Sequence, residues 1–363
     1  MRRAVIRTCR RIAGALLGSF VLSACTQLEP RSVARLDGNA SAINLLLDDL
    51  IAGFPDSLVR LGALEWKARV GTCDAIHAEA EDPARLLASV SCKPASKQPF
   101  EFRVPFERGT LTGQLLNPSA SKLDARVTIE PAPESWWRAL APGKPPMPER
   151  TRQAQRLLHV VWRPEEGLDF SRYAPRGNSQ VADLFRLRNQ LFSSLVLEGS
   201  FELAVYAPHP GARMPSTALA LGVKSRSAAA AALDAFINDL LTSWPVHPTP
   251  FSLGDAQGRC IPDLSLLPEL APCYVLLDDR VVIGWNRESL LEALGTTPEP
   301  SPSQRNRVHV DLTLLSKADR VLAQTLGASP LQISYPWTEL TIEGAESNSI
   351  RVSLTRSGPQ LTE

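Results

Sequence analysis

The chain has 363 residues, with 39 Lys and Arg against 38 Asp and Glu. This near balance argues against a basic nucleic-acid-binding protein and against an acidic disordered chain. Hydrophobic residues make up 44% and charged residues 21%, as is typical of globular proteins, and the length suits two or three domains.

The N-terminus has the features of an export signal. Ile12 to Leu22 is an uncharged, mostly apolar run, too short to cross a bilayer, which takes about 20 residues. It follows a positively charged stretch, as the apolar part of a secretory signal does. The arginines of that stretch are Arg2, Arg3, Arg7, Arg10 and Arg11. We therefore predict a signal peptide over residues 1–24.

Leu22, Ser23, Ala24 and Cys25 come at the end of this run. Their order resembles the lipobox of bacterial lipoproteins, in which small residues precede a cysteine that receives the lipid. The resemblance implies cleavage between Ala24 and Cys25, a diacylglycerol thioether on Cys25, and an acyl chain on the new amine. The alternatives are an ordinary signal peptide with a chance cysteine, and an uncleaved anchor.

The same resemblance implies a location in the bacterial cell envelope. Thr26, and not Asp, follows the cysteine, which favours the outer membrane and a protein that faces the periplasm. Cleavage removes five arginines and no acidic residue, so that 34 basic residues remain against 38 acidic ones. The sequence shows no polybasic patch for anionic head groups, so we expect the lipid alone to hold the protein at the membrane. We predict no cofactor other than this lipid.

Four cysteines remain beyond Cys25: Cys73, Cys92, Cys260 and Cys273. An even number in an exported protein indicates disulfides. The pairing Cys73–Cys92 with Cys260–Cys273 is favoured because each pair is local. The alternative is a zinc site, but no C-x-x-C spacing occurs and no histidine clusters with the cysteines.

The first predicted domain covers residues 41–140 and follows a polar tether over residues 25–40. Apolar residues at helical spacing predict a helix from Ser41 to Phe54. The period then changes to two, which predicts an antiparallel meander with one buried and one solvated face, covered by that helix. The alternating runs are 64–70, 86–92, 100–104, 111–115 and 123–129.

A proline-rich segment over residues 141–150 predicts a linker. The overall class is predicted as α+β, with a mixed α+β domain at 151–300 and a partial repeat at 301–363 packed on the same domain. The repeat would be a strand–helix–strand–strand unit that occurs twice. Its predicted helices are 181–195 and 314–326, and its strands are 157–162, 201–205, 217–223, 308–310, 331–334, 337–343 and 350–355.

Part of this second domain resembles a bacterial family catalogued as domain of unknown function number 3352. The resemblance spans residues 201–322, about a third of the chain, and implies an exported or membrane-anchored protein without supplying catalytic residues. The matching features are Phe201–Tyr206, Leu219–Val223, Cys273–Leu277, Val281–Gly284, Leu290–Leu294 and Val308–Leu312.

The sequence shows no convincing catalytic or metal-binding motif. None of the five histidines has metal-ligand spacing, and His159 and His309 are expected to be hydrogen-bonded within strands. Ser119 to Lys122 matches S-x-x-K but falls in a predicted turn, and Trp136 with Trp137 is more typical of packing than of ligand binding.

Two functional classes follow, and an enzyme is not expected. The first is a scaffold or interaction protein that contacts an envelope partner. The second is a periplasmic carrier for an apolar ligand such as a lipid, with a cavity beside the small residues Ala68, Ala88, Gly113 and Ala125. Nucleic acid is not an expected partner.

Overall fold

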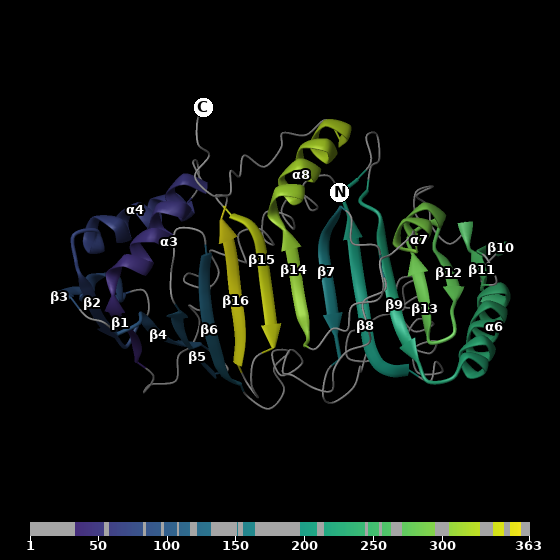
Figure 1. Cartoon of the computed structure of the whole chain (residues 1–363), viewed down its shortest axis with the longest axis horizontal. Helices are drawn as coiled ribbons and strands as arrows, with labels where there is room; N and C mark the ends of the chain where they lie inside the picture. Colours follow the sequence, from purple (N-terminus) through teal and green to yellow (C-terminus); the bar gives the residue numbers. More distant parts are fainter. Residues whose placement is uncertain are drawn as a thin grey trace. The chain divides into compact units, whose positions relative to one another are not determined.

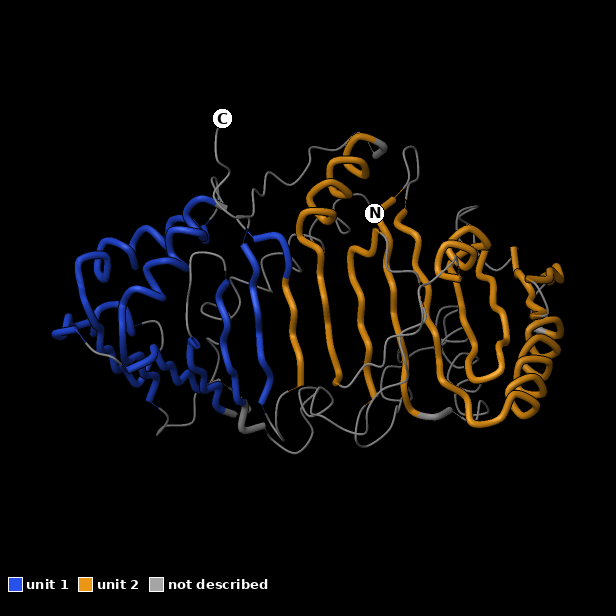
Figure 2. Tube along the Cα trace, in the orientation of Figure 1, with its two compact units in different colours: residues 1–138, 332–339, 345–363 blue, residues 139–331, 340–344 orange. Residues whose placement is uncertain are grey.

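The computed structural model describes residues 33–53, 58–82, 85–95, 98–106, 109–116, 122–131, 151, 155–163, 197–208, 214–243, 246–253, 256–262, 271–294, 305–326, 337–344 and 349–356. The chain forms two compact units (Figure 2). Unit 1 contains residues 1–138, 332–339 and 345–363, and unit 2 contains residues 139–331 and 340–344. Each unit combines an antiparallel sheet with helices, in keeping with an α+β class, and strands predominate.

Unit 1 has a sheet with the strand order β16-β6-β5-β4-β1-β2-β3, in which neighbours are antiparallel. Strand β15 (Trp337–Gly344) has its first residues in unit 1 and its last in unit 2. The other described elements of unit 1 are β1 (Ala34–Asn39), α3 (Ala40–Gly53), α4 (Leu58–Val70), β2 (Ala75–Ala80), the 3-10 helix η2 (Leu87–Ser89), β3 (Ser91–Lys93), β4 (Glu101–Phe106), β5 (Gly109–Leu116), β6 (Lys122–Pro131) and β16 (Ser349–Arg356).

Apolar and polar residues alternate along the strands of the unit 1 sheet, as the sequence predicts. In β5, Leu111 and Leu115 are buried, and in β6 Leu123 and Val127 are buried. The alternate positions are polar, so each strand has one core face and one solvated face. Helix α3 matches the predicted helix and packs on β2, and Figure 1 shows α3 and α4 beside the β1–β2 end of this sheet.

Two segments of unit 1 differ from their prediction. Residues 64–70 alternate in polarity but belong to α4, in which Ala63 and Val70 are buried on the same helical face and Leu64 is 42% exposed. Residues 86–92 form η2 and the start of β3. Short alternating runs were misleading because seven residues do not separate a period of two from a helix that is exposed on most sides.

The predicted tether over residues 25–40 is also wrong in its last part. Residues Ala34–Asn39 form β1, which pairs with both β2 and β4, and Ala34 and Leu36 are buried. Gly38 has a φ of +124°, and a Cβ there would lie 2.4 Å from the carbonyl oxygen of Pro99. Glycine is therefore required where β1 passes this neighbouring segment.

The prediction that residues 301–363 pack on the second domain is wrong for the C-terminal strand. Strand β16 pairs with β6 along seven residue pairs, from Ser349 opposite Thr128 to Thr355 opposite Lys122. The segments that pair are more than 200 positions apart in the chain, and Arg351 reaches Asp124 across them at 2.6 Å. Unit 1 is therefore built from both ends of the chain.

Unit 2 has the strand order β10-β11-β12-β13-β9-β8-β7-β14, again antiparallel throughout. Its described elements are β7 (Arg156–Trp162), β8 (Leu197–Tyr206), β9 (Thr217–Val223), α6 (Arg226–Ser243), β10 (Thr249–Leu253), β11 (Ala256–Cys260), β12 (Cys273–Leu276), β13 (Arg280–Gly284), α7 (Arg287–Ala293), β14 (Arg307–Asp311) and α8 (Leu312–Leu326).

Helices pack against both faces of the unit 2 sheet. Helix α6 packs through Leu233 against Leu221 of β9, whereas α7 packs through Leu290 against Ala220, the neighbouring residue on the opposite face. Because both faces of β9 are covered, its sequence from Ala218 to Val223 is apolar and does not alternate. Asn286 caps α7 by accepting a hydrogen bond from the Ser289 amide at 2.8 Å.

The predicted repeat is visible only in part. Its two first strands are β7 and β14, which pair antiparallel with His159 directly opposite His309. Helix α8 follows β14 as expected. The predicted helix 181–195, the strand 331–334 and the linker 141–150 lie outside the described residues.

Candidate functional site

The cysteine pairs occur where the sequence favours them. The structure joins Cys73 to Cys92 and Cys260 to Cys273. The first disulfide ties the segment after α4 to β3, and the second links β11 to β12, where the two cysteines are directly opposed. The predicted lipid-attachment residue Cys25, with Leu22, Ser23 and Ala24, lies outside the described residues. Within the described ranges, no helix is long and apolar enough to cross a membrane.

The outer face of the unit 1 sheet carries two rows of directly opposed polar side chains. We call these residues the polar sheet face. The first row is Arg351, Arg126, Gln114, Glu101, Asp37, His77 and Ser91. The second row is Ser349, Thr128, Thr112, Arg103, Arg35 and Glu79. Most of these residues are exposed or half-buried, so the face is open to solvent and to a partner.

Arginines meet twice on this face. Arg35 of β1 lies opposite Arg103 of β4, and Arg126 of β6 lies opposite Arg351 of β16. Directly opposed like charges destabilise a sheet, because their Cβ atoms are only about 5 Å apart. In each pair one arginine has a counter-ion: Arg35 bonds Asp37 at 2.8 Å, and Arg351 bonds an aspartate of β6 at 2.6 Å. The other two, Arg103 and Arg126, make no ion pair among the described residues.

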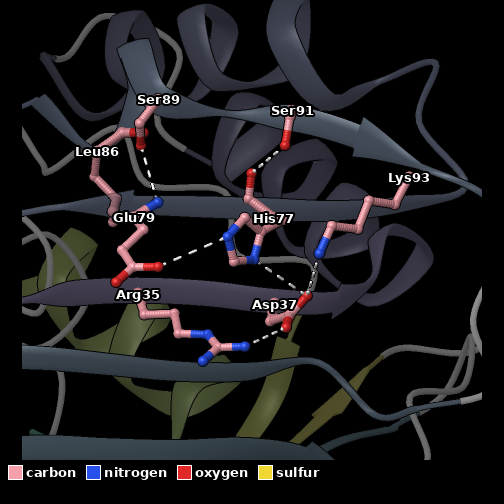
Figure 3. A network of polar contacts seen from close by, with 8 residues as sticks. All are labelled: Arg35, Asp37, His77, Glu79, Leu86, Ser89, Ser91 and Lys93. Atoms are coloured by element: carbon pink, nitrogen blue, oxygen red, sulfur yellow. Dashed lines mark hydrogen bonds and ion pairs between the residues drawn. The ribbon is translucent and has the colours of Figure 1, made fainter.

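At the other end of the face, His77 lies between two carboxylates (Figure 3). Its Nδ1 is 3.6 Å from Asp37 and its Nε2 is 3.8 Å from Glu79. Lys93 of β3 approaches the same aspartate at 3.9 Å, and Arg35 donates to it from β1. The result is a charge network across three strands in which Asp37 serves as the shared acceptor.

The ionisation of the face follows from these contacts. The hydrogen bond from Arg35 is the main reason that the pKa of Asp37 lies below its usual value. Burial alone would raise the pKa of Asp124, but hydrogen bonds from Ser353, Arg351 and Lys122 outweigh it and lower that pKa. Asp37 on the face and Asp124 beside it are therefore both charged at neutral pH, and the face presents fixed charges of both signs.

A second polar cluster lies inside unit 2 and converges on one carboxylate. Glu202 of β8 is 0% exposed, and its Oε1 accepts a hydrogen bond from the Thr151 hydroxyl at 2.5 Å. His159 Nε2 of β7 is 2.9 Å from the same oxygen, and Arg156 Nη1 is 3.6 Å from it. Sequence reasoning expected a hydrogen-bonded strand histidine at position 159, and the structure shows one.

This buried cluster has the character of a core network. Tyr206 on the same strand face is fully buried, and burial raises its pKa to about 12, so the phenol stays neutral. Thr151 and His159 are at most 4% exposed. Buried ionic groups need paired and hydrogen-bonded neighbours, and here those neighbours come from β7, β8 and the segment before β7. The cluster fixes β7 to β8 from the inside and offers no surface to a ligand.

His309 lies opposite His159 in the sheet and contacts Thr341 at 3.2 Å, within unit 2. No set of three His, Cys, Asp or Glu side chains in the described ranges is placed to hold a metal ion. Ser119, Trp136 and Trp137 lie outside the described residues. The polar sheet face is therefore the accessible feature that best fits a functional site.

Comparison with known proteins gives no family for this chain. No protein-family model matches it, and no curated protein matches it significantly.

Sequence reasoning missed the polar sheet face as a site. It identified the alternating strands, but Arg35, Arg103, Arg126 and Arg351 are spread over the whole chain, and no local run of basic residues marks them. The expectation that the protein lacks a basic patch considered neighbours in sequence only. Strand register, which the sequence does not show, brings these arginines into opposed pairs.

Proposed function

We propose that this chain is a lipid-anchored envelope protein that acts by binding a partner and not by catalysis, with the polar sheet face as its contact surface. The lipobox-like residues before Cys25 support export and anchoring. The observation that carries the binding role is the face itself, where two rows of polar side chains lie on a continuous sheet.

The rest of unit 1 supports a rigid contact surface. The inward-pointing residues of the same strands form the core, and the Cys73–Cys92 disulfide closes a 19-residue separation behind it. A sheet held in this way presents its side chains in fixed positions, which lowers the entropy lost on binding. Charges of both signs on the face give specificity for a complementary partner.

The small residues that suggested a carrier for an apolar ligand support that role less well in the structure. Ala68 lies on α4 and Ala88 lies in η2, so neither belongs to the sheet. Beside Gly113, the ring of Phe102 fills the space, since a Cβ on that glycine would be 2.2 Å from it. We therefore place the binding role ahead of the carrier role.

Site-specific photo-crosslinking in cells tests this proposal. A photoreactive amino acid at Thr112, in the middle of the polar sheet face, is expected to give a defined higher-mass adduct in the membrane fraction. The same probe at Arg69, an exposed position on α4, serves as the control and is expected to give none. Equal adducts at both positions, or none at Thr112 and the neighbouring face positions, would refute the contact surface.

The anchoring is tested separately with Cys25→Ser. This variant is expected to leave the membrane fraction after a high-salt wash, because the lipid would be its only stable attachment. A Cys25→Ser protein that stays membrane-bound under these conditions would contradict the lipoprotein assignment while leaving the crosslinking result intact.

A further inference from the structure

We infer that the polar sheet face binds an acidic segment of a partner protein, with Arg103 and Arg126 as the residues that contact its carboxylates. This inference rests on the proposed function and names the chemistry of the partner. It comes from charge complementarity, because each of these arginines faces another arginine and makes no ion pair among the described residues.

The two arginines flank a strand that carries only uncharged groups on this face. Thr112 of β5 lies opposite Arg103, and Gln114 of β5 lies opposite Arg126. Neighbouring strands are about 4.8 Å apart, so the two Cα atoms are separated by two strand spacings and an offset of two residues. An arginine side chain is long enough to span one strand spacing, so a ligand above β5 is within reach of both arginines.

Arginines placed in this way bind a carboxylate more favourably than they bind water. Guanidinium groups bind carboxylates through two parallel hydrogen bonds, which are stronger than neutral ones. An incoming carboxylate beside Arg103 also lies within reach of Arg35, and one beside Arg126 lies within reach of Arg351. Binding therefore relieves the like-charge repulsion in both pairs and adds charge-assisted hydrogen bonds.

The charge pattern favours a polypeptide over a lipid surface. The face has four arginines, but Asp37, Glu79 and Glu101 lie on the same rows. A uniformly anionic membrane meets the arginines and these acids together, so the net excess of one positive charge attracts the face only weakly. A polypeptide places its carboxylates over Arg103 and Arg126 and avoids the acids.

Fluorescence anisotropy with a defined probe tests this inference. The protein is the full mature chain with Cys25→Ser, and the probe is a labelled peptide of alternating Glu and Ser at a salt concentration of about 20 mM, where screening is weak. We expect Arg103→Gln with Arg126→Gln to weaken binding about tenfold or more, as the loss of two charge-assisted contacts predicts.

The matched control removes the same charge elsewhere. Arg69→Gln with Arg320→Gln changes exposed arginines on α4 and α8, and we expect it to change the affinity less than about twofold. A peptide with Gln in place of Glu is expected not to bind. Circular dichroism and urea unfolding verify that both double variants are folded.

Three results would overturn the inference: equal binding of the Glu and Gln peptides, unchanged binding by the Arg103 and Arg126 double variant, or an equal loss in the control. Binding of phosphatidylglycerol vesicles that depends on Arg103 and Arg126, without peptide binding, would assign the face to lipid instead. If crosslinking at Thr112 persists while the peptide does not bind, the contact surface stands and its acidic partner is wrong.

Discussion

Substitution of Asp49 is expected to destabilise unit 1 far more than substitution of its neighbour Asp48. Asp49 of α3 accepts a hydrogen bond from Trp337 Nε1 at 3.1 Å and forms an ion pair with Arg356 of β16. Trp337 is 1% exposed, and the side chains of Asp49 and Arg356 are 10% and 8% exposed. Asp48 pairs with Lys67 at 2.9 Å, but its side chain is 59% exposed.

The magnitude follows from what each substitution leaves behind. Asp49→Ala leaves a buried indole N–H without its acceptor, which costs about 1–3 kcal/mol, and a buried guanidinium without its counter-ion, for which broken buried pairs cost about 3–5 kcal/mol. Because the two effects overlap, we expect a loss of about 3–4 kcal/mol. Asp48→Ala removes only a surface pair and is expected to cost less than about 1 kcal/mol.

Urea unfolding followed by circular dichroism and tryptophan fluorescence measures the difference between the two variants. A free energy of unfolding that is about equal for Asp49→Ala and Asp48→Ala would refute the reasoning, since it would mean that the contacts of Asp49 contribute no more than a surface ion pair. Asp49→Asn adds a second check, because an amide oxygen still accepts from Trp337 while the charge is lost.

The pH dependence gives an independent check on the same residue. Burial raises the pKa of Asp49 above its usual value of 3.8, although Arg356 and Trp337 act in the opposite direction. A raised folded-state pKa contributes stability that is fully present below 3.8 and is lost as pH rises through the folded-state value. We expect Asp49→Asn to lack this decline above pH 3.8, whereas a wild-type slope in the variant would contradict the assignment.

Three further predictions follow from the described contacts. A fragment of residues 26–140 is expected to show broad amide exchange, because β6 lacks β16 and Asp49 lacks its partners; protection like that of the intact chain would contradict this. Tyr206→Phe is expected to flatten the loss of stability above pH 10, since the folded-state pKa of about 12 gives the wild type stability that is lost as the phenol ionises; an unchanged profile would contradict it. Replacing Cys73 and Cys92 by Ser is expected to cost about 3 kcal/mol in urea unfolding, and no change would refute a stabilising disulfide.

Local signals in the sequence predicted local structure well. The spacing of apolar residues predicted α3 and α8 to within two residues at either end. The cysteine pairs are local as well, and both occur between segments that are near in sequence. In each case the interacting groups lie within about twenty positions, where the possible partners are few.

The sequence did not predict which distant strands pair. Alternating residues show which face of a strand is buried, but they do not show which strand lies beside it. The run 349–356 reads equally well as a strand of either unit, and only packing selects β6 as its partner. The predicted domain boundary at residues 141–150 assumed that chain order and spatial order agree. Trp337 and Asp49 are 288 positions apart, and no property of either residue alone indicates their contact.

The pairing of β16 has a direct consequence for the polar sheet face. Arg351 and Ser349 enter the two rows only when β16 lies beside β6, and Arg356 of the same strand reaches back to Asp49 under the core. Strand β16 therefore completes the outer surface and contacts α3 on the inner side. The surface on which binding is proposed therefore depends on β16, although most of its residues lie between positions 35 and 128.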